Sequence, residues 1–380
     1  MNFGLTEEQL LLRSRAKNLA RRALVERAAH WDATAEVPWE NIDLLAREGY
    51  LGLLAPPAYG GTGASMFDLV LVLEEFGWAC VSTSMYVFGS NADALCIAQL
   101  GSPEHRSRYL PGMARGELLS CYAMSEPHAG SDGGAIRTTA ARRGGQYILN
   151  GQKCWISRAS VSHVFLVEVV FGGAGGRNEK GLLVIERGTP GLEIGPLGPL
   201  MGQRGSPSTL LTFRDCAVPL VNRLAPPDVQ SSLVASTLSR CCNAAIALGA
   251  AQRAYDEAVD YVQEREAFGK RLADFQGLRW TIADMAVKLE AARLLVYRAA
   301  VNAAEGHPSD AEAAIAKTFV NEAALSVVSD AMQLLGANGY SPAYPLERLY
   351  RDVRGFAITG GTTQIQRNVI ARKALGRRRH

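Results

Sequence analysis

The chain has 380 residues, of which 48% are hydrophobic and 20% charged, and its formal net charge is +3. This length exceeds what one small core organises, so we expect two or three domains. The composition excludes a disordered or fibrous protein, and the small net charge gives no reason to expect a nucleic-acid partner. The seven cysteines are scattered without a CxxC pair, which excludes a disulfide framework and predicts no metal site.

The two ends of the chain give no sign of targeting. Residues 1–8 lead directly into an amphipathic helix rather than into a signal peptide. No apolar run reaches the ~18–20 residues that span a bilayer, so we expect a cytoplasmic protein without a membrane partner. The basic residues 377–380 are interpreted as a solvated tail. The Ala-, Gly- and Arg-rich composition is typical of a bacterium with GC-rich coding DNA.

The first block, residues 1–117, has helical patterns from Leu5 to about Gly116. A Gly- and Pro-rich stretch at 55–63 interrupts them and is interpreted as a loop. We therefore expect an N-terminal helical domain.

The second block, residues 118–222, changes to strand character. Its strand candidates are residues 146–149, 153–156, 164–167 and 182–185. The dipeptide Asn150-Gly151 between the first two predicts a hairpin turn. The Gly-rich segment 172–177 lacks the strand-to-helix context of a phosphate-binding loop, so it is interpreted as a flexible hairpin loop.

The third block, residues 223–380, is helical again. One stripe of apolar residues repeats at spacings of three and four: Ile282, Met285, Leu289, Ala292 and Val296. Ser309 and Glu312 have the spacing of a capping box and follow a helix stop at Gly306 and Pro308. The stripe predicts a long helix in a bundle and says nothing about function by itself.

Four segments carry groups suited to binding a cofactor: residues 122–132, 155–157, 264–276 and 350–367. Small residues and hydroxyls in the first allow a ligand close to the backbone. Trp155 and Ser157 offer a stacking face and a polar contact to a flat ring. Each segment also has a purely structural interpretation, because a tryptophan beside a turn is commonly core, and an arginine in a charged helix is commonly solvated.

Seven motifs in one order nevertheless resemble the acyl-CoA dehydrogenase family from end to end. They are SEPHAGSD, NGQKCWIS, MGQRGS, EREAFGKRLADFQ, MQLLGANGY, YPLERLYRDVR and GGTTQIQRNVIARKALG. The resemblance implies an α+β multi-domain fold: an N-terminal helical domain, a central β-domain (an antiparallel barrel or sandwich) and a C-terminal four-helix bundle. It implies FAD as the cofactor and an acyl-CoA or acyl-carrier-protein thioester as the substrate. It also implies an electron-transfer flavoprotein or similar acceptor, and a homodimer or homotetramer.

The same resemblance assigns residues to the site. Those implied to contact the flavin half of FAD are Tyr122, Met124, Ser125, Trp155, Ile156 and Ser157, with Thr362 and Gln364 on the dinucleotide. Those implied to hold the adenosine and pyrophosphate end from a neighbouring subunit are Arg265, Phe268, Gln276, Gln333 and Gly336. The forked, permanently charged guanidinium of Arg265 suits a pyrophosphate. The substrate would contact Ser131, Arg240, Thr359 and Gly360.

The catalytic base that the resemblance implies is missing. The family's glutamate positions correspond here to Gly360 and Ser239, and neither side chain is a carboxylate. Four interpretations stay open: a dehydrogenase with a substitute base or an activated substrate; the base-less half of a heteromer; other flavin chemistry, such as oxygenation, enoyl-thioester reduction or redox-neutral elimination; and a non-catalytic binding protein. Asp93 with an ordered water is a candidate base, although we expect it to be a solvated or capping carboxylate.

Overall fold

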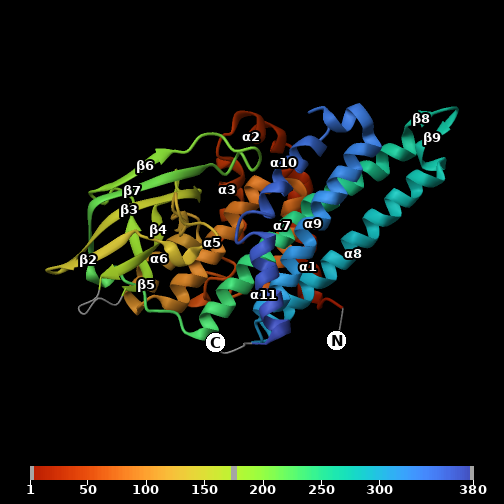
Figure 1. The fold of residues 1–380 in the computed structure, drawn as a ribbon. Helices are drawn as coiled ribbons and strands as arrows, with labels where there is room; N and C mark the ends of the chain where they lie inside the picture. The colour runs from red at the N-terminus through yellow and green to blue at the C-terminus, as the bar shows by residue number, and fades with distance from the viewer. Residues whose placement is uncertain (1–3, 173–177, 377–380) are drawn as a thin grey trace.

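The computed structural model describes residues 4–172 and 178–376, and it places a sheet beside a large group of helices (Figure 1). Residues up to Ala114 form helices: α1 (Glu7–Leu19), η1 (Ala20–Leu24), α2 (Ala28–Thr34), α3 (Trp39–Arg47), η2 (Tyr50–Gly52), η3 (Pro57–Tyr59), α4 (Met66–Ala79), α5 (Val81–Leu100) and α6 (Pro103–Ala114). Ser65 and Ser102 begin α4 and α6 as reciprocal capping boxes. The predicted N-terminal helical region is confirmed.

The central part of the chain is a curled sheet of seven strands. These strands are β1 (Ser120–Ala123), β2 (Thr139–Arg143), β3 (Gln146–Ser157), β4 (Val164–Gly172), β5 (Asn178–Glu186), β6 (Leu192–Pro196) and β7 (Ser208–Pro219), with the short helices η4 (Gly133–Ala135) and η5 (Leu220–Asn222). Their order is β1-β4-β2-β3-β7-β6, with β5 paired to β4. Most pairs are antiparallel as expected, but β4 pairs in parallel with both β1 and β2.

The predicted hairpin turn at Asn150-Gly151 is wrong. Strand β3 runs through both residues, and Gly151 (φ 145°) only marks an irregularity in its pairing with β7. The actual hairpin turn is Gly144-Gly145, where Arg143 pairs with Gln146 and Gly144 has φ 58°. A two-residue Gly-Gly loop provides the same positive-φ freedom as Asn-Gly, and cross-strand pairing with β7 keeps residues 150–151 extended. The Gly-rich residues 173–177 lie outside the described residues, but the strands on either side of them pair antiparallel.

The last part of the chain is the helical bundle. Its elements are α7 (Val229–Glu264), β8 (Glu266–Ala267), β9 (Lys270–Arg271), η6 (Leu272–Asp274), α8 (Gln276–Ala304), α9 (Asp310–Leu335), η7 (Gly336–Tyr340), α10 (Leu346–Phe356) and α11 (Thr363–Leu375). Four stripe residues of α8 are buried as predicted: Met285, Leu289, Ala292 and Val296. Ser309 accepts from the Glu312 amide, which confirms half of the predicted box, while the Glu312 carboxylate binds Asn302 instead.

Helix α7 is the central helix of the whole molecule, with α4, α8 and α9 packed around it. It is long and apolar enough to cross a membrane by length and composition, contrary to the expectation that no segment would be. However, 67% of its most apolar window is buried inside the protein, as in a core helix. The fold class is confirmed, whereas the domain boundaries at 117/118 and 222/223 stay predictions.

Candidate functional site

Trp155 is an aromatic residue that β3 presents to the outside. Between Lys153 and Ile156 the strand advances three residues while β7 advances two, so β3 carries a β-bulge there. Trp155 adopts φ 60°, a left-handed conformation that costs a non-glycine residue about 1 kcal/mol or more. The bulge turns the indole outward, and 60% of the residue surface is exposed. An apolar ring held in a strained, outward position is typical of a binding platform.

The SEPHAGSD segment is fastened directly to this part of β3. The fully buried Lys153 donates from Nζ to the Glu126 carboxylate (2.8 Å) and to the Met124 carbonyl (2.9 Å), and the Cys154 amide donates to the Ser125 carbonyl. Burial alone raises the pKa of Glu126, but hydrogen bonds from Lys153 and from the amides after Ile136 lower it to about 2. The structure thus brings Met124 and Ser125 close to the part of β3 that carries Trp155.

Asp93 connects the sheet to the helices instead of lying in solvent. It is buried on α5, with 2% of its surface exposed, and its Oδ2 accepts from Ser120 (2.8 Å) and from Arg158 (3.4 Å). The expectation that Asp93 is solvated or caps a helix is therefore wrong. Burial raises the pKa of Asp93, and the adjacent guanidinium opposes this rise. Gly89 on α5 is required here, because a β-carbon at that position would overlap the Arg158 guanidinium.

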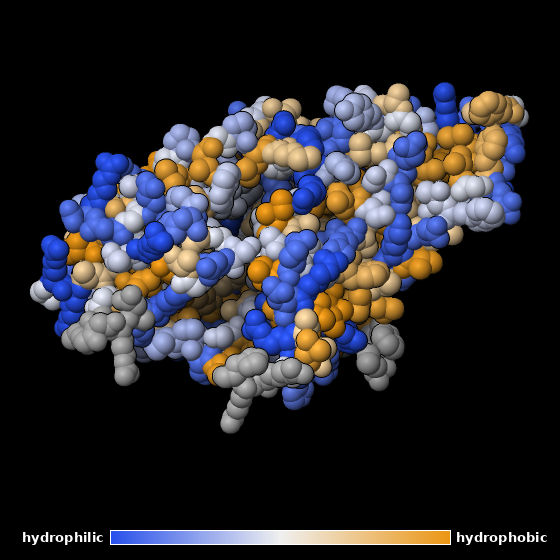
Figure 2. All heavy atoms as spheres, viewed as in Figure 1, coloured by the Kyte–Doolittle hydropathy of each residue, from blue (hydrophilic) through white to orange (hydrophobic). Residues whose placement is uncertain are grey.

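A second connection fastens the MGQRGS segment to α10. The Gln203 amide donates to the buried Asp352 carboxylate at 2.5 Å, and the Gln203 side chain donates to the Asp352 carbonyl. Burial raises the pKa of Asp352 to about 7, although the Gln203 bond opposes the rise. Tyr86 of α5 also donates to the Gly205 carbonyl. The Trp155 end of the sheet therefore faces α5 and α10, and Figure 2 shows the surface hollowed between the sheet and the helices.

The turn between α10 and α11 is held by buried polar side chains. The ammonium of Lys317 on α9 donates to the carbonyls of Phe356 (3.1 Å) and Gly361 (2.7 Å). One turn later on α9, Asn321 donates to the Phe356 carbonyl and to Asn243 Oδ1, both at 2.8 Å. In addition, the amide group of Gln366 donates to the carbonyls of residues 360 and 361. These bonds fix the backbone of residues 356–361.

Gly360 is an exposed residue of this turn and has φ 62°. A β-carbon added to it would lie 3.6 Å from the Ser239 hydroxyl and 3.7 Å from Lys317 Cε. It would also lie 3.8 Å from Asn243 Nδ2, whose amide donates to the Thr359 hydroxyl at 3.4 Å. The two positions at which the resemblance implies a glutamate, 360 and 239, are thus neighbours in space.

Lys317 gives this turn a positive charge. The side chain is fully buried, and in residues 4–172 and 178–376 no carboxylate forms an ion pair with it. Burial first, and then the Arg240 guanidinium, lower the pKa of Lys317 to about 8. Arg240 is different because it is paired with Asp310 (2.7 Å). The surroundings of Gly360 are therefore rich in donors and carry an uncompensated cation.

The residues implied to bind the adenosine end lie on another part of the chain. Arg265, Phe268 and Gln276 surround the β8–β9 hairpin, which projects from the bundle at the end opposite the sheet (Figure 1). Phe268 is 95% exposed with φ 54°, and in the described residues Arg265 forms no ion pair. We refer to residues 264–276 as the tip. The structure does not bring the tip together with Trp155 in one chain.

The other predicted residues are divided among exposed and structural positions. Tyr122, Ser131, Gln333, Gly336, Thr359 and Gln364 are exposed, and Ser157 is half-buried, with its hydroxyl 3.4 Å from that of Ser208. The hydroxyl of Tyr122 donates to Glu168 (2.5 Å), and Thr362 is the N-cap of α11. The side chain of Ile156 packs in the core of the sheet, so that only its backbone can contact a ligand.

The sequence interpretation missed the side chains that hold the turn. Lys317 and Asn321 are four residues apart on a helix whose neighbouring positions are mostly alanine and valine. A lysine and an asparagine on the apolar face of a helix are a usable signal, since such groups are buried only with partners.

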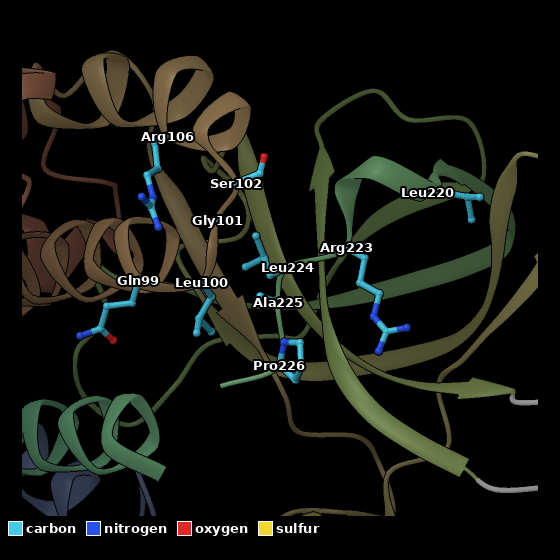
Figure 3. Close-up of a pocket in the computed structure, with 10 residues that line it drawn as sticks. All are labelled: Gln99, Leu100, Gly101, Ser102, Arg106, Leu220, Arg223, Leu224, Ala225 and Pro226. Carbon is cyan, nitrogen blue, oxygen red and sulfur yellow. The ribbon is translucent and has the colours of Figure 1, made fainter. Parts of the chain in front are cut away.

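Two surface hollows lie elsewhere. One, of about 520 Å³, lies where the end of α5 and the start of α6 meet residues 220–226, and Figure 3 shows Arg106 and Arg223 on opposite sides of it. Arg223 already has partners within the protein: it forms an ion pair with Glu179, and its guanidinium lies 4.1 Å from the ring centre of Phe171. The other, of about 590 Å³, adjoins the tip. Neither is lined by one of the individual residues that the resemblance assigned to the site, but Glu264, Glu266 and Arg271 of the tip line the second.

Comparison with known proteins identifies the family. Sequence profiles of the N-terminal, middle and C-terminal domains of acyl-CoA dehydrogenase match residues 6–117, 121–216 and 232–375. The chain is a member of the acyl-CoA dehydrogenase family. Members are flavin oxidoreductases that act on CH–CH bonds, with FAD as the cofactor.

Three similar proteins illustrate the range of the family. The short-chain specific acyl-CoA dehydrogenase of Clostridium acetobutylicum is 35% identical over 98% of this chain and 99% of its own. The 3-sulfinopropanoyl-CoA desulfinase of Paraburkholderia xenovorans is 38% identical over 99% of this chain and 98% of its own. The structure of butyryl-CoA dehydrogenase from Megasphaera elsdenii has a TM-score of 0.94 and 30% identity, covering 99% of this chain and all of that one.

The described residues fit FAD at two separate places. A flat ring needs an apolar face, and the exposed indole of Trp155 provides one beside the Ser157 hydroxyl. A pyrophosphate needs unpaired cations, and the exposed guanidinium of Arg265 provides one beside the exposed ring of Phe268. The sheet that carries Trp155 and the β8–β9 hairpin lie apart in the molecule (Figure 1), so the described residues of one copy do not bring the two places together.

Proposed function

We propose that this member of the family catalyses α,β-dehydrogenation of an acyl thioester carried on coenzyme A or an acyl carrier protein. The observation that carries the proposal is the exposed indole of Trp155, held at φ 60° at a β-bulge. Such strain persists only where the surrounding structure imposes it. The strain fits a ring platform and has no evident structural use.

FAD bound there would supply the hydride acceptor for the β-carbon of the substrate. The chain's own residues position the reactants. Trp155 and Ser157 hold the flat ring, with Met124 and Ser125 kept beside them by the Glu126–Lys153 pair. Ser131 would contact the pantetheine arm, and the fixed turn of residues 356–361 would face the acyl group.

The α-proton is the unsolved part of this reaction. Among the described residues, the side chains nearest to a β-carbon at Gly360 are Ser239, Asn243 and Lys317, and none of them is a carboxylate. Asp93 does not fill this role, because it is buried and is bound by Ser120 and Arg158. The substrate must therefore have an activated α-carbon, or a partner subunit must supply the base.

We further propose that FAD is bound between two copies of the chain, in a dimer or a tetramer. The tip would hold the adenosine end of a cofactor whose flavin lies against Trp155 of the other copy. Helix α8, which begins at the tip, exposes Trp280, Val287 and Leu294 at intervals of seven residues. Figure 2 shows hydrophobic side chains along the rim of the bundle over α8, which supports a contact between copies there.

An electron-transfer flavoprotein or similar acceptor would reoxidise the flavin in this scheme. Redox-neutral elimination from an acyl thioester is a second candidate. Two observations support it: positions 239 and 360 carry no carboxylate, and a relative at 38% identity is named a desulfinase. The two differ in whether electrons leave the substrate.

The test is to mix the FAD-loaded protein anaerobically with acyl-CoA esters and to record the flavin absorbance and the products. Dehydrogenation bleaches the flavin and gives an enoyl thioester; elimination gives product while the flavin remains oxidised. If no ester of any length bleaches the flavin or is converted, both candidates fail.

Ser239→Glu tests the missing base directly. It places a carboxylate beside Gly360 from a helical backbone, and we expect dehydrogenation of saturated esters to rise about 10²- to 10⁴-fold, with Ser239→Gln as the uncharged control. Gly360→Glu should act in the same direction but with about 1–2 kcal/mol of strain, because φ is 62°. Equal rates for the Glu and Gln variants would contradict the proposed position of the acyl group.

A further inference from the structure

The surroundings of Gly360 contain more positive charge than the protein itself balances. Lys317 is fully buried and its ammonium binds two backbone carbonyls, Phe356 and Gly361. A buried ammonium is normally paired with a carboxylate, because desolvation of an unpaired charge is costly. In the described part of the chain, Lys317 has no such partner.

The side chains around Gly360, next to the buried Lys317, carry hydrogen-bond donors. The hydroxyl of Ser239 and the amide of Asn243 both face Gly360, and the Thr359 hydroxyl lies beside that amide. We name Ser239, Asn243, Lys317 and Thr359 the Gly360 site. Three neutral donors beside one buried cation can donate hydrogen bonds to the oxygens of an acid group, and the cation stabilises its charge.

Nearby acidic residues do not satisfy this site. The Asp310 carboxylate accepts hydrogen bonds from Arg240 and Ser236, so its charge is balanced by Arg240 and not by Lys317. Arg240 adds further positive charge, which is one of the two causes that lower the pKa of Lys317. The local field therefore favours an anion that comes from outside the chain.

We propose that the Gly360 site binds an acid group on the acyl chain, so that the preferred thioesters carry a short carboxylate or sulfinate instead of an alkyl end. This inference rests on the proposed function, because it requires the acyl group to lie against the turn of residues 356–361. It assigns to substrate recognition the place where the resemblance implies a catalytic glutamate. Lys317 and Ser239 are then the residues that determine specificity.

The test compares binding of matched thioesters to the FAD-loaded protein by equilibrium dialysis, without turnover. Succinyl-CoA and butyryl-CoA have acyl chains of four carbons, and they differ in a terminal carboxylate against a methyl group. We expect succinyl-CoA to bind at least about tenfold more tightly, since a hydrogen bond to a charged group is typically worth that factor or more. 3-Sulfinopropanoyl-CoA against the same butyryl-CoA reference distinguishes sulfinate from carboxylate.

Two variants locate this preference. Lys317→Met should reduce the ratio of the affinities for succinyl-CoA and butyryl-CoA to about one. Because Lys317 also holds the turn, Ser239→Asp provides a second route: its carboxylate supplies the anion from the protein, so the preference should disappear or invert, whereas Ser239→Asn should retain it.

Equal binding of acidic and alkyl thioesters by the wild-type protein would overturn the inference, as would a preference that both variants retain. If butyryl-CoA bleaches the flavin and no acid preference exists, the proposed function stands and the inference alone falls. If none of the thioesters binds, both fall.

Discussion

The turn between α10 and α11 and the tip around β8–β9 are both assigned to binding, but the chain surrounds them very differently. At the turn, side chains from α9 and α11 bind the carbonyls of residues 356, 360 and 361, and all three of them, Lys317, Asn321 and Gln366, are fully buried. At the tip, Phe268 is 95% exposed and Arg265 has no ion pair with any described residue. The carbonyls of the turn are bound by side chains of the same chain, whereas the exposed groups of the tip remain available to a cofactor or a second copy.

This difference teaches how a binding surface can be recognised without its ligand. Buried side chains at the turn donate to its backbone carbonyls, so we expect the turn to keep its shape when no substrate is bound. Asn321 Oδ1 and Gln366 Oε1 are buried there without a hydrogen-bond partner in the described residues. At the tip, the exposed ring of Phe268 contacts the edge of Phe275, and Arg265 forms no ion pair with any described residue. The positive φ of Phe268 belongs to the two-residue turn Phe268-Gly269 between β8 and β9, whereas that of Trp155 lies at a bulge inside a strand.

The largest expected effect concerns Asp352, which supports α10 just before the turn. Its pKa is raised to about 7 in the folded protein, against about 3.9 in the unfolded chain, so the folded state binds more protons between these values. The free energy of unfolding should therefore fall as pH rises from 4 to 7, by roughly 2–4 kcal/mol from this group. Asp352→Asn should remove that part of the slope in urea titrations at several pH values.

The subtraction of the Asp352→Asn curve from the wild-type curve isolates this group from the other carboxylates. Identical pH slopes in the two proteins would contradict the burial of an ionisable Asp352. Charged residues facing this carboxyl are Asp32, Arg348 and Arg351, of which only the first raises the pKa.

A smaller effect is expected when the turn loses one of its bonds. Asn321→Ala leaves Asn243 Oδ1 without its donor inside the protein, which should lower the free energy of unfolding by about 1–3 kcal/mol. Asn338→Ala is the matched control, because that exposed amide binds only the Tyr261 hydroxyl and its loss should cost less than about 0.5 kcal/mol. Chemical denaturation of both variants makes the comparison, and equal losses would remove the distinction between buried and exposed polar groups.

The smallest effect on folding is expected at the tip. Arg265→Ala should leave the unfolding free energy of the FAD-free protein within about 0.5 kcal/mol of wild type, because the side chain is exposed and unpaired. The same variant should weaken FAD binding by about 10- to 100-fold, since a charged donor to the pyrophosphate is lost. Gel filtration followed by absorbance of the protein peak measures the retained flavin.

Arg214→Ala, an exposed arginine of β7 paired with Glu193, is the control for charge removal and should keep its FAD. Full retention of FAD by Arg265→Ala would contradict the role of the tip. Loss of stability in the absence of FAD would instead show that the tip is a structural element.

Much of the fold could be predicted from the sequence, for local reasons. The apolar stripe from Met285 to Val296 predicted a long helix, because every third or fourth residue returns to the same face. The hairpin at Asn150-Gly151 was wrong, because pairing of β3 with β7 outweighed the local turn preference. Asp93 was misjudged for a similar reason: Arg158, which buries and pairs it, is 65 residues away in the chain.

For the site, the sequence by itself determined which groups are present: an indole and a hydroxyl after a strand, an arginine and a phenylalanine at a hairpin, and no carboxylate at positions 239 and 360. Only the tertiary structure decided which of them meet. It placed Ser239 and Asn243 of α7 and Lys317 of α9 around Gly360, and it left the hairpin with Arg265 and Phe268 at the far end of the bundle. The physical reason is that residue identity fixes local chemistry, whereas charge compensation and burial depend on neighbours that the packing of helices α7, α9 and α10 brings together.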